Sequence, residues 1–155
     1  MEVKNKELHR VVSTAIIHKK GKFLILKRSL DKKVWPGKWT VPGGGLTVDD
    51  YINTPKTTES IWYSALEKNL RREVKEECDL EIDDIRYLLD LVFIRPDGIP
   101  VVTISFLAEY KSGEVKLNEE SVDYAWVSLQ EAKNYDLIEG ILGELELADK
   151  KISAP

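Results

Sequence analysis

The chain has 155 residues and a mass of 17.7 kDa; 43% of its residues are hydrophobic and 32% are charged. This composition is that of an ordinary globular protein and excludes extended disorder. The length predicts one domain over residues 1–155 that buries about two thirds of the surface of the unfolded chain. The formal net charge is −4 and no basic block is present, so a nucleic-acid polymer is not an expected partner.

Cysteine use and hydropathy predict a cytoplasmic protein. Cys78 is the only cysteine, which excludes an internal disulfide and a Cys-based zinc cluster. No apolar run reaches the roughly 18 residues of a membrane span, so a membrane is not an expected partner either. Residues 1–10 are charged along their length and lack the apolar centre of a secretion signal, and we expect them to be a polar lead-in.

The first predicted elements are the two strands of a β-hairpin. Residues 11–18 and 23–28 are rich in β-branched and apolar side chains, and the segment 19–22 between them contains the turn residue Gly21. Arg28 ends the second strand, where its guanidinium can contact a phosphate or remain solvated at a sheet edge.

A glycine-rich loop follows, with one short strand over residues 39–41. Pro42 cannot donate to a strand ladder, and Gly43, Gly44 and Gly45 allow backbone angles closed to other residues. We therefore expect the strand to end at Val41 and the chain to turn sharply, with bare backbone facing any ligand. A glycine triplet alone more often marks a turn than a phosphate site.

Two tryptophans flank this loop. Trp35 and Trp39 can stack on a nucleobase, because an aromatic face accepts every base. Core packing is the expected role for at least one of them.

A long helix is predicted from Thr57 or Thr58, either of which can cap it, to about Cys78. Residues at helical spacing form its core-facing stripe, namely Tyr63, Leu66, Leu70, Val74 and Cys78.

Three carboxylates lie beside this stripe. Glu73, Glu76 and Glu77 stand at i, i+3 and i+4, so they share one helical face. Like charges at this spacing destabilise a helix by roughly 0.2 to 0.5 kcal/mol per pair, whereas a hard divalent cation would turn the repulsion into a binding site. Mg²⁺ is the first candidate and Mn²⁺ its substitute. On these residues alone, a solvated charged face is an equal alternative.

Together, residues 35–46 and the run RREVKEECDL over residues 71–80 resemble the Nudix hydrolases. The signature of that family is a glycine-rich loop followed by a helix carrying REUxEExGU, where U is aliphatic. The chain matches it except at Asp79, which replaces the glycine. A glutamate that the family carries eight residues before the arginine is replaced by Ser64. Residues 46–58 form an insertion, which we expect to be a lid, a dimer contact or an ordinary surface loop.

The resemblance implies the fold and the roles of individual residues. The fold is α/β (α+β), a Nudix α/β/α sandwich with a mixed β-sheet between helices. The three helical glutamates hold magnesium, with Glu76 also catalytic, Arg72 orients one of them, and the backbone of residues 43–45 positions the substrate. Glu120, six residues before Trp126, corresponds to a family glutamate that joins the metal site or acts as general base. Glu119 is the alternative candidate for this role. A surface turn of acidic residues without a role in catalysis is the structural alternative.

The remaining elements are strands and a C-terminal helix. Residues 85–94 and 101–110 predict a long hairpin around the turn 95–100, and residues 124–127 a further strand. Residues 128–131 form a capping box. The last helix has an apolar side for core or interface packing, formed by Ile138, Ile141, Leu142, Leu145 and Leu147.

The predicted function is Mg²⁺-dependent hydrolysis of a phosphoanhydride in a nucleoside diphosphate linked to X. By resemblance to MutT-like enzymes, the substrate is a nucleoside triphosphate, a dNTP or a modified nucleotide, which gives a nucleoside monophosphate and pyrophosphate. ADP-ribose or a nucleotide sugar is the second candidate. A Nudix-fold binding or regulatory module that has lost catalysis, or a purely structural domain, are alternatives of other classes. The sequence specifies no base, and its apolar last helix permits a homodimer.

Overall fold

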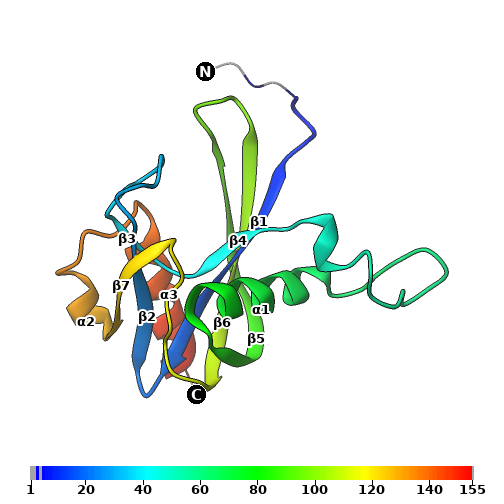
Figure 1. Cartoon of the computed structure of the whole chain (residues 1–155). Helices are drawn as coiled ribbons and strands as arrows, with labels where there is room; N and C mark the ends of the chain where they lie inside the picture. Colours follow the sequence, from blue (N-terminus) through cyan, green and yellow to red (C-terminus); the bar gives the residue numbers. More distant parts are fainter. Residues whose placement is uncertain (1–2, 4, 155) are drawn as a thin grey trace.

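The computed structural model describes residues 3 and 5–154 (Figure 1). Residues 1, 2 and 4 of the predicted lead-in lie outside this range. The elements are, in order, β1 (Arg10–Lys19), β2 (Lys22–Arg28), β3 (Trp39–Thr40), β4 (Gly43–Gly45), the 3-10 helix η1 (Val48–Asp50), α1 (Ala65–Cys78), β5 (Glu81–Ile94), β6 (Pro100–Ser112), β7 (Ser121–Val127), α2 (Leu129–Ala132) and α3 (Ile141–Ser153). No helix within the described residues combines the length and the apolar character that crossing a membrane requires.

The strands of the described residues form one mixed sheet. The order is β3-β2-β1-β6-β5, with β4 paired to β1 and β7 paired to β2. Strands β1 and β6 are parallel, and the other pairs are antiparallel. Helix α1 covers one face of the sheet and α3 the other (Figure 1). The predicted α/β/α sandwich with a mixed sheet between helices is confirmed.

The central strands are apolar on both faces because each face carries a helix. Successive side chains of a strand point to opposite faces, so Ile16 and Phe23 pack on the α3 side while Ile17 and Leu24 pack on the α1 side. Each of these side chains is fully buried, which stabilises the fold by about 1.5 to 3 kcal/mol per side chain. This two-sided core fixes α1 against the sheet.

Strands β1 and β2 separate soon after their turn. Their pairing is confined to His18 with Phe23 and Lys19 with Lys22. Nearer its start, β1 pairs with β4 instead, through Val12, Ser13 and Thr14. The sheet is therefore split between β1 and β2, and the split opens a cavity.

The glycine triplet is a strand, which differs from the expected sharp turn. Strand β3 ends at Thr40, one residue earlier than predicted, and β4 then runs antiparallel to β1. A Cβ atom on Gly43 would collide with the carbonyl oxygen of Ser13. Glycine is needed here because two backbones approach closely.

Helix α1 begins at Ala65, so the predicted start at Thr57 or Thr58 is wrong. The backbone amides of both threonines donate to the carbonyl oxygen of Ile61 and close a turn. Ser64 has a left-handed backbone, with φ 62°, which a helix cannot pass through.

Contacts within the preceding loop explain the late start of α1. The rings of Tyr51 and Trp62 lie 5.2 Å apart, and the Trp62 indole N–H donates to the carbonyl oxygen of Thr54. The loop thus packs on itself. The same geometry leaves Tyr63 59% exposed, so its predicted place on the core stripe is also wrong.

The C-terminus of α1 and the N-terminus of α2 agree with the sequence predictions better than the start of α1 does. Asp79 ends α1 in a left-handed conformation, with φ 57° and ψ 36°, as expected for the residue that replaces the family glycine. The capping box is present, because Ser128 Oγ accepts from the Glu131 amide and Glu131 Oε1 accepts from the Ser128 amide, both at 3.1 Å.

Candidate active site

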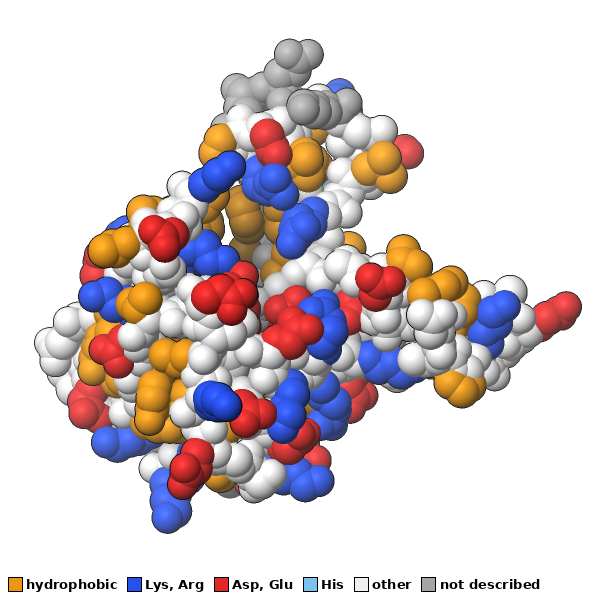
Figure 2. Space-filling model, viewed as in Figure 1, with side chains coloured by type: hydrophobic (Ala, Val, Ile, Leu, Met, Phe, Trp, Pro, Cys, Tyr) orange, Lys and Arg blue, Asp and Glu red, His pale blue; other side chains and the backbone are white. Residues whose placement is uncertain are grey.

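A cavity of about 830 Å³ opens where the sheet splits. Figure 2 shows it as a hollow between the protruding β5–β6 hairpin and the body, with charged side chains at its rim and hydrophobic side chains behind. Its walls come from β1, β2, β4, α1, the tip of β5, the loop before β7 and the start of α3. A cavity of this size is typical of a small-molecule site.

One end of the cavity is acidic. We call it the acidic end; it is formed by Gly43–Gly45, Glu73, Glu77 and Glu120. Glu77 is buried, and its Oε2 accepts a hydrogen bond of 3.0 Å from the Gly43 amide. Burial raises the pKa of Glu77 to about 8 against the opposing effect of that amide, and the charges of Glu73 and Glu120 raise the pKa further.

Glu73 reaches the same end beside β4. Its carboxylate lies so close to Gly44 that a Cβ atom there would overlap it. Burial raises the pKa of Glu73, opposed by the Arg72 guanidinium, whose Nη1 lies 3.0 Å from Glu73 Oε1. Glu76 differs from the other two. Its side chain is 55% exposed, it pairs with Arg72 at 3.0 Å, and it is not part of the cavity wall.

Arg72 is held by Asp50, which the sequence analysis missed. The Asp50 side chain is 1% exposed and accepts from Arg72 Nε and, at 3.2 Å, from Arg72 Nη2. It also accepts from Asn69 Nδ2 at 3.3 Å and from the Thr47 amide at 2.9 Å. The bond with Arg72 lowers the pKa of Asp50, so this carboxylate stays ionised.

Asp50 gives part of the insertion a definite role. The first turn of residues 46–58 places a carboxylate behind Arg72, whereas Ser64, the position of the family glutamate, lies exposed before α1. The sequence did contain a signal, because Thr47 and Asp50 have the spacing of a capping box, and the structure forms that box.

Glu120 enters the acidic end from the loop before β7. Its Oε1 lies 2.7 Å from Lys32 Nζ, and this bond lowers the pKa of Glu120. Glu120 lines the cavity, whereas Glu119 is exposed and does not. Of the two candidate glutamates, the structure therefore places Glu120 in the cavity wall.

Three cations line the cavity together with the carboxylates. Arg28, as predicted from its place at a strand end, is joined by Arg10 and Lys32. Arg28 Nε donates to the Val34 carbonyl oxygen at 3.1 Å. Arg10 packs against Gly45, where a Cβ atom would overlap its guanidinium.

The two tryptophans lie in different surroundings. Trp35 lines the cavity, and its ring meets Phe93 edge-on at 6.0 Å. Trp39 packs on Tyr135 at 4.8 Å in the core under α3 and is not part of the cavity wall.

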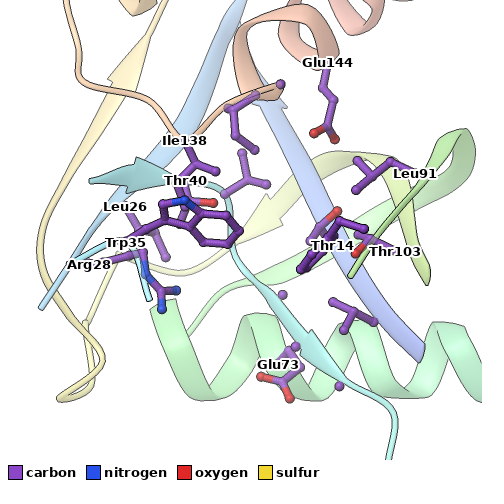
Figure 3. A pocket seen from close by; sticks show the side chains of 18 of the residues that line it. Thr14, Leu26, Arg28, Trp35, Thr40, Glu73, Leu91, Thr103, Ile138 and Glu144 are labelled. Atoms are coloured by element: carbon purple, nitrogen blue, oxygen red, sulfur yellow. The ribbon is translucent and has the colours of Figure 1, made fainter. Parts of the chain in front are cut away.

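Helix α3 also reaches the cavity. Ile138, Ile141 and Glu144 line the part remote from α1, which we call the far end, together with Thr14 and Thr103 (Figure 3). The prediction that the C-terminal helical region serves only for packing was therefore incomplete.

Residues 7–145 match the family model described as the NUDIX domain. The match spans most of the chain, so the chain belongs to the Nudix family, as its resemblance predicted. It is a Nudix pyrophosphohydrolase, an enzyme that acts on acid anhydrides.

Individual relatives agree with this assignment. The chain is 31% identical over 143 residues to the nucleoside triphosphatase NudI of Klebsiella pneumoniae (strain 342), covering 83% of this chain and 88% of the relative. The crystal structure of the MutT protein from Methanosarcina mazei Go1 superposes with a TM-score of 0.71 and 26% identity, covering 97% of this chain and all of that one. The NUDIX domain of Shewanella oneidensis NrtR, solved with ADP ribose, shares the fold with a TM-score of 0.72 and 20% identity, covering 95% and 90% of the two chains.

Proposed function

We propose that this enzyme hydrolyses a nucleoside triphosphate, a dNTP or a modified nucleotide, to the nucleoside monophosphate and pyrophosphate. The observation that carries the proposal is one cavity whose acidic end combines Glu73, Glu77 and Glu120 with Arg28 and Lys32. Cations and carboxylates side by side suit a metal-bound polyphosphate better than either charge alone would. Sequence relatives named as nucleoside triphosphatases support a triphosphate over ADP-ribose.

We further propose that Mg²⁺, or Mn²⁺ in its place, binds at the acidic end, since a divalent cation is typical of the family. Among the described residues, no three Asp, Glu, His or Cys side chains already form a metal cage. Magnesium in phosphate chemistry does not need one, because one or two carboxylates, waters and the substrate phosphates complete its shell. Burial raises the pKa of Glu77, and the charges of Glu73 and Glu120 raise it further, so a cation bound beside this carboxyl group would stabilise its ionised form.

In this proposal Glu73 and Glu77 hold the metal, with Glu120 as a further ligand or general base. Glu76 can join them from the rim once its ion pair with Arg72 opens. When bound, the metal supplies stabilisation of the charge that develops on the phosphate oxygens.

Other side chains of the chain bind, orient or take up a proton. Arg28 and Lys32 contact phosphate oxygens, and the bare backbone of Gly43–Gly45 lets the polyphosphate approach closely. Arg72, fixed by Asp50, orients Glu73. Lys32 keeps Glu120 ionised in the free enzyme. When Lys32 turns to a phosphate, Glu120 can take the proton of the attacking water.

A nucleotide panel tests the proposal. The four dNTPs, the four NTPs and ADP-ribose are incubated with the enzyme, with and without Mg²⁺, and the products are separated by ion-exchange chromatography. We expect Mg²⁺-dependent formation of a monophosphate and pyrophosphate from at least one triphosphate. Preferred hydrolysis of ADP-ribose, or release of orthophosphate in place of pyrophosphate, would contradict it.

The proposal also covers the domain organisation, the cellular location and the oligomeric state of the protein. We propose that residues 1–155 act as one domain in the cytoplasm. The loop between η1 and α1 exposes Ile52, Ile61 and Tyr63, and these apolar side chains support a homodimer. Light scattering of the purified protein, compared with an Ile61→Ser variant, tests the dimer.

A further inference from the structure

Three buried side-chain oxygens of the described residues have no hydrogen-bond partner: Thr14 Oγ1, Ser105 Oγ and Glu144 Oε1. Buried polar atoms are almost always paired, because water lost on burial has to be replaced. Three unpaired atoms therefore point to a partner that the folded chain alone does not provide.

These three atoms come from neighbouring elements. Thr14 of β1 and Ser105 of β6 are partners in the parallel register of the two strands. Glu144 lies on α3. Burial raises the pKa of Glu144, and the neighbouring Ser105 side chain opposes this rise. The two residues nevertheless do not meet the geometry of a hydrogen bond through Ser105 Oγ or Glu144 Oε1. The result is a polar patch in an otherwise apolar region.

The patch faces the cavity. Glu144 is only 6% exposed, yet it lines the cavity together with Thr14 and Thr103. Figure 3 shows its carboxylate pointing into the cavity from α3, with Glu73 on the opposite side and Trp35 along one flank between them. A ligand whose phosphates lie at Glu73 therefore extends its other end toward Glu144.

We propose that the far end is a nucleobase-recognition site, in which Glu144 accepts an N–H hydrogen bond from the edge of the base and Thr14 forms a second hydrogen bond. The inference rests on the proposed function, because it places the base of the same nucleotide. A carboxyl group suits this role, because the positions of N–H donors and of acceptors on the base edge differ among bases, so an acceptor held at one position favours some bases over others. Trp35 offers the aromatic surface on which the ring stacks.

The alternative is that Glu144 is a buried acid that matters only for folding. A structural role would lower activity toward all nucleotides by the same factor. Base recognition changes the ratio of kcat/KM among nucleotides and leaves ligands without a base unaffected. The two roles are therefore separable.

The test uses Glu144→Gln, which keeps the shape of the side chain and replaces one acceptor by a donor. We expect the ratio of kcat/KM between the best and the worst dNTP to change at least about tenfold, the size of one base-specific contact. Inhibition by tripolyphosphate, which has no base, should be unchanged. Glu146→Gln is the matched control, because Glu146 lies on the same helix, is exposed and does not line the cavity.

Two additions keep the test decisive. Thr14→Val removes the second hydroxyl and leaves the carboxyl group in place, so it serves if Glu144→Gln does not fold. Binding of unphosphorylated nucleosides without metal, followed by NMR, is independent of hydrolysis. Failure of the wild type to hydrolyse any nucleotide would overturn the proposed function, while nucleoside binding would still decide the inference. Unchanged dNTP ratios together with unchanged nucleoside binding in both variants would overturn base recognition.

Discussion

The two ends of the cavity bury carboxyl groups in opposite settings. At the acidic end, Glu77 accepts from the Gly43 amide and lies beside the like charges of Glu73 and Glu120. At the far end, burial raises the pKa of Glu144, the Ser105 side chain opposes that rise, and Glu144 Oε1 has no hydrogen-bond partner among the described residues. Crowded like charges require a cation, whereas an isolated polar group suits a neutral heterocycle. This contrast supports the proposal that phosphates bind at one end and the base at the other.

The largest effect is expected from Glu77→Gln. Loss of a ligand carboxylate should lower kcat/KM by at least roughly 100-fold, the upper range for removal of even an outer metal-site partner. The loss should be equal for all nucleotides, unlike that of a far-end variant. Steady-state kinetics with the panel measures it, and Glu67→Gln, an exposed change on the same helix, is the control. A loss that depended on the base would contradict the division between the ends.

Asp50→Asn should affect the acidic end indirectly, through Arg72. It removes the charge that fixes Arg72 while keeping the shape of the side chain, and we expect a 10- to 100-fold lower kcat, the range for partners that orient ligands. KM should change little because Asp50 does not line the cavity. The neighbouring exposed Asp49→Asn is the control. Unchanged kcat would show that Arg72 is oriented without Asp50.

Substitutions of the β4 glycines should destabilise the protein to different extents. Gly43→Ala places a Cβ atom against the backbone of β1, which cannot move, and overpacking of this kind costs roughly 1 to 3 kcal/mol. Gly45→Ala meets only the mobile guanidinium of Arg10 and should cost less. Urea unfolding of both variants measures the difference. Equal destabilisation would mean that the close approach of β4 to β1 is not rigid.

The pH dependence of stability should report the raised pKa values of Glu77 and Glu144. The pKa of Glu77 is about 8 in the native state and about 4.5 when unfolded, so the native state keeps a proton that the unfolded chain releases. Without metal, the free energy of unfolding should therefore fall as pH rises from about 4.5 to about 8, by up to several kcal/mol, since each unit of pKa difference is worth about 1.4 kcal/mol. Glu144, whose pKa is also raised, contributes in the same direction.

Mg²⁺ separates these contributions. In the proposed site Mg²⁺ binds ionised carboxylates, so its addition should restore stability at pH 8 in the wild type and in Glu144→Gln. Glu77→Gln should show a flatter pH profile and little response to Mg²⁺. Urea unfolding between pH 5 and pH 8, with and without Mg²⁺, measures this. A profile that does not change with pH in the wild type would contradict the assignment of a raised pKa to Glu77.

The sequence predicted the acidic end far better than the far end. The carboxylates of α1 lie within one helical turn and the glycines are adjacent in sequence, and the resemblance to the Nudix hydrolases joined these two segments and Glu120 into one expected site. The far end instead depends on Thr14 and Glu144, with Ser105 beside them, and these residues meet only after β1 has paired with β6 and α3 has docked. In the sequence each of these residues sits in an ordinary apolar pattern.

Two other differences between prediction and structure have tertiary contacts as their cause. Residues 57–64 have helical capping signals, but the contact between Tyr51 and Trp62 ties the loop to itself and delays α1. Asp50 was hidden in a segment interpreted as an insertion, because its partner Arg72 lies 22 positions further along the chain. Tertiary contacts decided both.

A crystal structure with Mg²⁺ and an α,β-imido dNTP tests the central claim, that one cavity binds phosphates at one end and base at the other. The account predicts Mg²⁺ and phosphates beside Glu73, Glu77 and Glu120, with the base beside Trp35 and its edge on Glu144. Phosphates near Glu144, or a base lying outside the cavity, would contradict it.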